Sequence, residues 1–128
     1  MRIDKVLLDK LCGEALQSPR LRMNLDLRTS AEDSSQRMLN ALMPGTVVPV
    51  HRHVRSTESV FCLSGVMDEI LFAEDGKTEV ERIHLDPAAG SYGCQVPAGV
   101  WHTVEVFEPS VIFEAKDGRF DEDGNERL

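Results

Sequence analysis

Cysteine is scarce in this sequence, and the few cysteines do not form a recognisable binding pattern. Cys12, Cys62 and Cys94 are odd in number and widely spaced, and no Cys-x-x-Cys pair occurs. This spacing argues against a zinc ribbon and against a disulfide framework, so we expect reduced thiols and a cytoplasmic protein. Buried cysteine usually packs as a small hydrophobic residue, although Cys62 shares a strand face with Glu58 and its sulfur could also approach a site there.

Long hydrophobic runs and an excess of positive charge are also missing. No stretch of about 18 apolar residues is present, so we expect no membrane span. Asp9 and Lys10 interrupt the apolar stretch near the N-terminus, which argues against a signal peptide. The formal net charge is −8, and such a surface would repel the phosphates of nucleic acids. We therefore expect neither a membrane nor a nucleic-acid partner.

The 128 residues fit a single domain, which is expected to begin with one helix. Apolar side chains recur every three or four positions after Asp4, which predicts an amphipathic helix with Asp4 as its N-cap. Ser18 and Pro19 are expected to end this helix. Alternating polar and apolar residues over 20–27 predict an extended segment, and the polar residues 28–35 predict a loop.

From residue 36 onward the chain is a series of short predicted strands separated by turn signals. Asp75 and Gly76, between two apolar runs, are a strong signal for a β-hairpin. Short strands at nearly even spacing, with no helix between them, predict an all-β antiparallel sandwich or barrel. The predicted strands are 38–43, 47–53, 58–63, 66–73, 78–85, 92–96, 100–107 and 111–116.

Two histidines separated by a single residue are the strongest indication of a functional site. In a strand, residues i and i+2 point to the same face with Cα atoms about 6.5–7 Å apart, so the imidazoles of His51 and His53 can converge on one metal ion. Residues 54–57 suffice for a tight turn, which lets Glu58 supply a third ligand from the next strand. His102 is a fourth candidate much farther along the chain. Three histidines and one glutamate predict a metal site.

Several other polar residues are candidates for contact with a small molecule. The planar guanidinium of arginine suits carboxylate or phosphate, so arginines near the first strands could form an anion-binding edge, or could simply pair with the many acidic residues. Glu114 and Lys116 share a strand face and could project into the cavity as acid, base or anchor, or could be exposed to solvent. The candidate substrate-binding residues are Arg20, Arg22, Asn24, Arg37 and Asn40.

The spacing of these residues resembles the two sequence motifs of the cupin superfamily. Every fixed position of the first motif is matched, and so is the centre of the second. The matching segments are Gly45-x5-His51-x-His53-x4-Glu58-x6-Gly65 and Pro97-x-Gly99-x2-His102. The resemblance implies a single-domain antiparallel double-stranded β-helix, or jelly-roll barrel, with an N-terminal α-helix packed outside it.

Two positions depart from the usual form of the second cupin motif. The motif usually opens with a glycine where this chain has Ser91, and often closes with an asparagine where it has Val106. Neither position supplies a metal ligand, so metal binding is unaffected by the departures. By position, the resemblance makes the metal ligands His51, His53, Glu58 and His102.

Nearly the whole chain is similar to the WbuC family of small bacterial cupin metalloproteins. The segments that carry this similarity are 18–24, 36–40, 44–46, 51–53, 97–103 and 113–116. The resemblance implies a helix and extended segment over 1–35 packed on the barrel, a cupin barrel over 36–117 and a polar C-terminal tail over 118–128. It also implies a link to O-antigen or other cell-surface polysaccharide metabolism.

The predicted ligands favour one divalent transition metal ion. Imidazole and carboxylate suit Zn, Fe, Mn, Ni or Cu better than Ca or Mg, and four protein ligands leave one or two positions open. Our first hypothesis is a metal-dependent isomerase, epimerase or hydrolase of a small polar molecule such as a sugar derivative or organic acid. The alternatives are a metal-dependent dioxygenase and a non-catalytic metal- or ligand-binding module. A homodimer is expected by analogy with barrels that bury an exposed edge.

Overall fold

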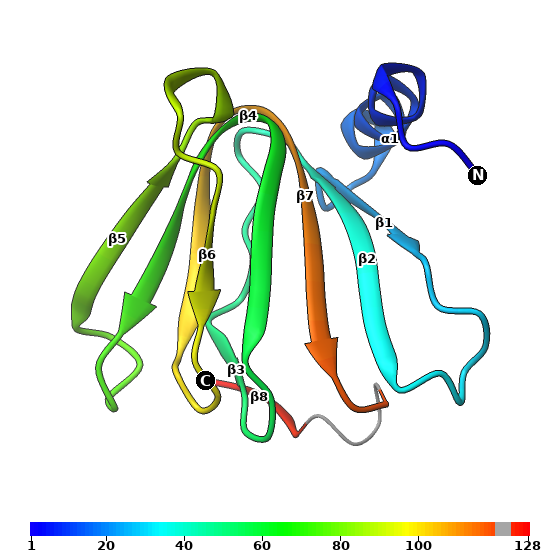
Figure 1. The fold of residues 1–128 in the computed structure, drawn as a ribbon. Helices are drawn as coiled ribbons and strands as arrows, with labels where there is room; N and C mark the ends of the chain where they lie inside the picture. The colour runs from blue at the N-terminus through cyan, green and yellow to red at the C-terminus, as the bar shows by residue number, and fades with distance from the viewer. Residues whose placement is uncertain (120–123) are drawn as a thin grey trace.

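The computed structural model describes residues 1–119 and 124–128. Over these residues the protein is one curled antiparallel β-sheet of eight strands, shaped like a half-barrel, with one α-helix at its side (Figure 1). This confirms the predicted all-β fold with an N-terminal helix. In chain order the elements are α1 (Lys5–Gln17), β1 (Arg22–Asp26), β2 (Ser35–Leu42), β3 (His51–His53), β4 (Glu58–Phe72), β5 (Glu79–Leu85), the 3-10 helix η1 (Pro87–Ala89), β6 (Gly93–Val96), β7 (His102–Asp117) and β8 (Asn125–Arg127).

Strand β7 is the central element of the sheet. It pairs with β2 through its C-terminal half, with β3 at its N-terminal end, and with β4 along most of its length. The sheet continues from β2 to β1, from β3 to β8, and from β4 to both β5 and β6. The predicted hairpin around Asp75 and Gly76 is confirmed, because β4 and β5 are antiparallel neighbours on either side of it.

The sheet packs a hydrophobic core against each of its two faces. Strand β2 alternates between them: Leu42 contributes to the core inside the half-barrel, whereas Leu39 and Ala41 face outward beneath α1. Leu11 and Ala15 of α1 are buried in the outer core. The helix therefore covers the outer face of β1 and β2 and leaves the inner face to the polar site.

The predicted N-terminal helix is confirmed together with its cap. Asp4 has extended backbone geometry, and its side chain accepts a hydrogen bond from the Leu7 amide at 3.1 Å. The Ser18 amide donates to the Ala15 carbonyl and closes the other end. The cap matters because the first four amides of a helix have no partner within it.

Replacing Asp4 with alanine is expected to lower the free energy of unfolding by about 1 kcal/mol. The substitution removes the acceptor for the Leu7 amide and leaves the packed face of α1 intact. Urea unfolding followed by circular dichroism measures the change. Asp4→Asn is the matched control, because asparagine retains an oxygen acceptor; an equal loss for both variants would contradict the capping role.

Two strand boundaries differ from the sequence-based prediction, and both lie at the same bend. The breaks predicted near Gly65 and near Pro109 are absent, because β4 and β7 pair continuously past them. The pairing shifts register at Ser64 and Val66 instead. Gly65 has a positive φ of 99°, and proline in a strand is tolerated at such irregularities. Glycine and proline therefore bend these strands without ending them.

The strand predicted over 47–53 is shorter in the structure, where β3 begins at His51. Two backbone carbonyls of the segment before it accept hydrogen bonds from side chains. The Val47 carbonyl accepts from the Arg22 guanidinium at 2.7 Å, and the Val48 carbonyl accepts from the Thr103 hydroxyl at 2.6 Å. These contacts hold an irregular segment beside the paired histidines.

Part of the predicted polar tail over 118–128 forms a strand. Strand β8 pairs with β3, with Arg127 opposite His51 and Asn125 opposite His53. Residues 120–123 lie outside the described part of the chain. Within the part described, no helix has the length and apolar character needed to cross a membrane.

Candidate metal centre

Three histidines from two strands meet inside the half-barrel. His51 lies directly opposite His102 in the β3–β7 pairing, and His53 shares a face with His51 two positions along β3. Potential ligand atoms of the three rings lie within 4.8 Å of one another. His53 and His102 are buried and His51 is partly so. The three side chains could therefore hold one metal ion between them.

Backbone carbonyls fix which nitrogen of two of these rings carries the proton. His51 Nδ1 lies 2.8 Å from the Pro49 carbonyl, and His102 Nδ1 lies 2.9 Å from the Val100 carbonyl. Because a carbonyl can only accept, Nδ1 is the donor in each ring, and Nε2 keeps its lone pair. A contact of this kind orients a metal-binding imidazole.

The environment of His102 fits a metal ligand. Its Nε2 is buried, and among the described residues it has no hydrogen-bond partner. Burial lowers the pKa of His102, and burial together with the nearby His102 ring lowers the pKa of His51 to about 4. Both imidazoles are therefore neutral at pH 7, which is the form that binds metals.

Glu58 brings a negative charge to the same place. Its carboxylate lies 3.3 Å from His53 Nε2 and 3.5 Å from the Lys116 ammonium, and all three side chains are buried. Burial alone would raise the pKa of this carboxyl, but the contact with His53 and the positive charge of Lys116 lower it well below its usual range. Glu58 is therefore ionised beside the histidines.

A small cavity connects the histidines to further carboxyl groups. Its volume is about 30 Å³, which is close to the volume of one water molecule in the liquid and leaves room for a single ion. Carboxyl groups enter it from β4 and β7, and apolar side chains complete its lining. The lining residues are Asn40, Leu42, Val48, His51, Glu58, Glu69, His102, Val104, Ile112 and Glu114.

Two of these carboxyl groups hold protons more tightly than usual. Burial and the negative charge of Glu58 raise the pKa of Glu114 to about 8, although Lys116 opposes the change. Burial, Glu58 and Glu114 together raise the pKa of Glu69 well above its usual value. The cavity thus places protonated carboxyls beside an ionised one, an arrangement typical of sites that transfer protons.

Glu69 is the site residue that the sequence analysis missed. It lies on β4 between Met67 and Leu71, which share its inward face and are buried in the core. A carboxylate at an inward position of an alternating apolar strand was the available signal. The signal was weak because the adjacent Asp68 is also acidic, so acidic residues fall on both faces of the strand predicted over 66–73.

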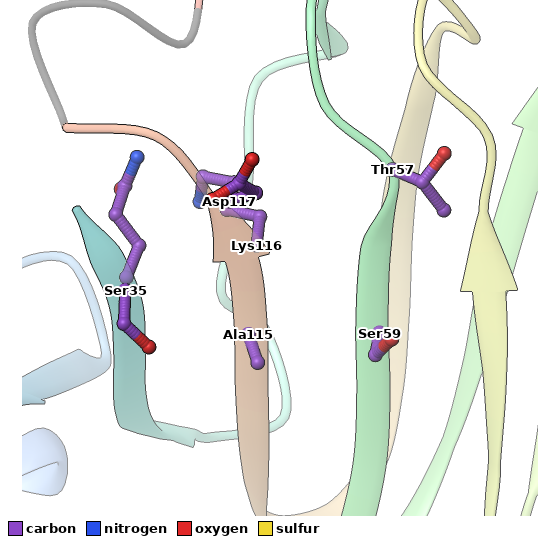
Figure 2. A pocket seen from close by; sticks show the side chains of 7 residues that line it. Ser35, Thr57, Ser59, Ala115, Lys116 and Asp117 are labelled. Atoms are coloured by element: carbon purple, nitrogen blue, oxygen red, sulfur yellow. The ribbon is translucent and has the colours of Figure 1, made fainter.

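Lys116 connects this cavity to a larger and more open one. The larger cavity, of about 320 Å³, lies between the ends of β2, β4 and β7 (Figure 2). It is lined by Ser35, Gln36, Thr57, Ser59, Ala115, Lys116 and Asp117. Of the two predicted acid/base candidates, Glu114 lines the metal cavity and Lys116 lies between the two cavities, next to Glu58.

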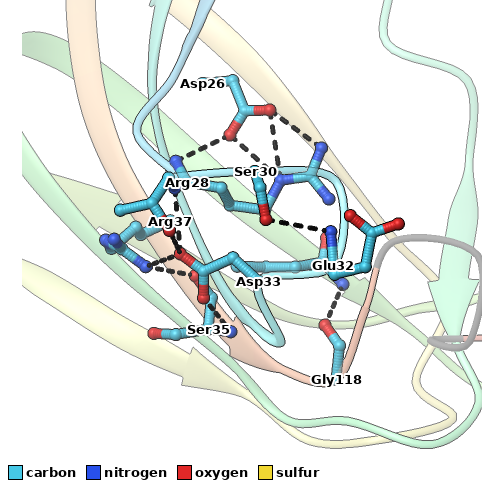
Figure 3. Close-up of polar contacts among 10 residues, drawn as sticks. Asp26, Arg28, Ser30, Glu32, Asp33, Ser35, Arg37 and Gly118 are labelled. Atoms are coloured by element: carbon cyan, nitrogen blue, oxygen red, sulfur yellow. Dashed lines mark hydrogen bonds and ion pairs between the residues drawn. The ribbon is translucent and has the colours of Figure 1, made fainter.

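Four of the five predicted substrate-binding residues gather in a separate cavity of about 170 Å³. Arg37 is not among them. It shares the outer face of β2 with Leu39 and Ala41, and its guanidinium lies 3.0 Å from the Asp33 carboxylate in a network of loop contacts (Figure 3). The cavity is lined by Arg20, Arg22, Asn24, Asn40, Val48, Pro49, His51, Asn125 and Arg127.

Cys62, His84 and Trp101 do not line the metal cavity. Cys62 is buried in the inner hydrophobic core, as expected for a small apolar side chain. The side chain of His84 is 58 % exposed and contacts the Asp68 carboxylate. Trp101 packs under the Arg52 guanidinium, 4.4 Å from the ring centre, and does not line the metal cavity.

A family model described as "Domain of unknown function (DUF6016)" matches residues 3–85. The matched region extends from α1 to β5 and contains His51, His53 and Glu58, whereas His102 lies beyond it. No curated protein matches the sequence.

Solved structures with the same fold include proteins of different kinds. An oxalate oxidase in complex with glycolate superposes with a TM-score of 0.66 at 15 % identity, over 87 % of this chain and 57 % of its own. The capsular polysaccharide assembling protein CapF from Staphylococcus aureus gives 0.71 at 17 % identity, over 87 % and 32 %. The chain spans little more than half of the oxalate oxidase chain and a third of CapF.

One similar structure has nearly the same length as this chain. It is an uncharacterized conserved protein with a double-stranded beta-helix domain from Klebsiella pneumoniae, with a TM-score of 0.69 at 14 % identity, over 100 % of this chain and 97 % of its own. At such low identity these similarities establish the fold alone. The fold is the cupin-like double-stranded β-helix, and a site of three histidines is typical of it.

Proposed function

Because the chain belongs to the family described as "Domain of unknown function (DUF6016)", its role has to be inferred from the site, and we propose that it is a metal-dependent enzyme acting on a small polar molecule. In this proposal His51, His53, His102 and Glu58 hold one divalent transition metal ion. The proposal is supported by the convergence of the three imidazoles, of which those of His51 and His102 are neutral, and by the ionised carboxylate beside them. When bound, such an ion would supply Lewis-acid chemistry.

The donor atoms narrow the choice of ion. Three imidazoles and one carboxylate favour zinc, iron, manganese, nickel or copper over calcium and magnesium. The unpartnered Nε2 of His102 supports ligation, because a buried nitrogen without a hydrogen bond is costly unless another group uses its lone pair. Lys116, whose ammonium lies 3.5 Å from the Glu58 carboxylate, would balance the charge of that carboxylate.

A single observation carries the enzymatic part of the proposal. Glu69 and Glu114, which are not proposed ligands, line the same cavity of about 30 Å³ as His51 and His102. A protein that only binds a metal does not need additional protonated carboxyls at its site, since burying such groups costs stability. Their presence supports a site that holds and transfers protons at the Glu114 carboxyl.

The acid and base candidates support the proposed reaction class. An isomerase, epimerase or hydrolase needs a positioned acid and a positioned base, and Glu114 together with Lys116 would provide them. We further propose a WbuC-type protein linked to cell-surface polysaccharide metabolism. The family resemblance of the sequence supports this link, and so does the shared fold with CapF, a capsular polysaccharide assembling protein.

Replacing Glu114 with glutamine is expected to slow proton exchange at a substrate carbon by about 100-fold or more, because the amide cannot carry a transferable proton. The metal-loaded protein is incubated in D2O with a panel of sugar phosphates and hydroxy acids, and deuterium incorporation is followed by mass spectrometry. Glu105→Gln, an exposed carboxylate outside the cavity, is the control and should exchange at the wild-type rate. Equal rates for wild type and Glu114→Gln would contradict the proposed role.

A dioxygenase is the second candidate, because the same donor set also suits redox-active ions. Elemental analysis of protein purified without a histidine tag separates the two functions. Zinc with no oxygen uptake supports the isomerase, epimerase or hydrolase. Iron or copper, with oxygen consumed in the presence of an organic acid, would overturn that assignment and favour the dioxygenase.

A further inference from the structure

Three arginines gather around the cavity of about 170 Å³ next to the metal centre. Arg20 precedes β1, Arg22 begins it, and Arg127 lies on β8, so widely separated segments bring their guanidinium groups to one place. Burial and the positive charges of Arg20 and Arg127 lower the pKa of Arg22, which reflects how closely the three charges approach. Such a cluster is unexpected in a chain of net charge −8.

These three arginines also lack the partners that other arginines of the chain have. Arg28, Arg37, Arg52 and Arg82 each pair with a carboxylate at 3.1 Å or less. Within residues 1–119 and 124–128, no carboxylate pairs with Arg20, Arg22 or Arg127, and no acidic residue lines their cavity. The chain has 22 acidic residues, so this local lack of negative charge leaves the cluster open to an anion from solution.

The cluster is held in place by the backbone around it. Arg22 donates from one guanidinium nitrogen to the Val47 carbonyl at 2.7 Å, which fixes its position and leaves its remaining donors available. The Thr46 hydroxyl donates to the Arg20 carbonyl at 2.7 Å. Arg127 lies opposite His51 in the β3–β8 pairing, on the same face of the sheet. The Arg22 guanidinium and the backbones that carry Arg20 and Arg127 are thus positioned before any ligand arrives.

A neutral polar group extends the site toward the metal centre. The Asn40 side-chain oxygen is buried, and among the described residues it has no hydrogen-bond partner. Asn40 and His51 line both this cavity and the metal cavity, so the two spaces adjoin. A buried acceptor without a donor is costly, which indicates that a ligand hydroxyl can complete it.

We propose that this cavity binds the phosphate group of a hydroxylated small molecule, which Arg20, Arg22 and Arg127 hold so that its hydroxyls reach Asn40 and the metal centre. Guanidinium forks match the paired oxygens of phosphate, and three positive charges suit a dianion better than a singly charged carboxylate. The orientation toward the metal rests on the proposed function. The phosphate site itself does not.

Titration of the metal-loaded, isotope-labelled protein with inorganic phosphate tests the proposal. Saturable chemical-shift changes are expected at Val48, His51 and Arg127, with sodium acetate binding at least about tenfold more weakly. Arg22→Gln and Arg127→Gln should each raise the dissociation constant about tenfold or more. Arg28→Gln, which removes an arginine paired with Asp26 outside the cavity, is the matched control and should leave it unchanged.

Several results would overturn the proposal. One is the absence of saturable phosphate binding by the wild type. Another is that Arg28→Gln weakens phosphate binding as much as Arg22→Gln and Arg127→Gln do. A third is that Arg22→Gln and Arg127→Gln leave phosphate binding unchanged, as expected for phosphate attached to the metal itself. Metal content is measured on the same samples. If the wild type retains one ion per chain but does not bind phosphate, only the phosphate site is contradicted. If the wild type binds phosphate without stoichiometric metal, only the proposed metal-dependent function is contradicted.

Discussion

Replacing His102 with alanine is expected to reduce bound metal from one ion per chain to nearly none. The substitution removes the buried Nε2 that has no hydrogen-bond partner among the described residues, and it leaves two imidazoles and a carboxylate to hold the ion. His51→Ala should have the same effect, because His51 lies opposite His102 in the β3–β7 pairing. Elemental analysis of protein expressed without a histidine tag measures the stoichiometry.

His84→Ala is the matched control for this experiment. His84 also lies on a strand and contacts a carboxylate, but its side chain is largely exposed and does not line the cavity. This variant should keep its metal. Full stoichiometry in His102→Ala or in His51→Ala would show that the residue concerned is not a ligand. Circular dichroism of each variant verifies that the sheet is intact.

Replacing Gly65 with alanine is expected to lower the free energy of unfolding by about 3–5 kcal/mol, which is at the upper end for single substitutions. Gly65 lies at the bend of β4 with a φ of 99°, where a side chain is already strained. An added Cβ would also collide with the Pro109 carbonyl and the Ser110 side chain, and would lie 2.6 Å from the Ser110 Cα. The backbone of β7 cannot move aside without losing its pairing.

Gly90→Ala separates backbone strain from the collision. Gly90 has a similar φ of 87°, but nothing lies within 4 Å of a Cβ placed there. Its substitution should cost only about 1 kcal/mol. Urea unfolding of both variants gives the comparison, and equal losses would rule out the close approach of β4 and β7 as the reason for glycine at position 65.

The histidine cluster could be predicted from sequence because its geometry is local or encoded by a motif. His51 and His53 need only a strand to face the same side, and the second motif identifies His102 without any knowledge of the pairing. The pairing of β3 with β7 then brings the rings together. The helix was equally accessible, since both its apolar period and its cap lie within a few consecutive residues.

Other parts of the site depend on contacts that the sequence does not express locally. Glu69 is buried because β4 crosses the interior beside β7, and its own neighbours resemble an ordinary amphipathic strand. Arg127 follows a polar segment with no strand signal, yet it pairs opposite His51. Arg37 was predicted to lie with Asn40 at the substrate-binding site, but the two side chains point to opposite faces of β2. Their separation of three positions along the strand reverses the side-chain direction.

The three residues of β3 also determine when the metal centre can form. This strand has no partner close to it in sequence: it pairs with β7 through His51 and His102, and with β8 through residues 125–127. Such distant contacts form late, after the more local hairpins. If the proposed site binds a metal, we expect ligation to follow the transition state for folding, so that a bound ion would slow unfolding while leaving the folding rate almost unchanged. The ion would slow the unfolding of a sheet that has already formed and would not help that sheet to form.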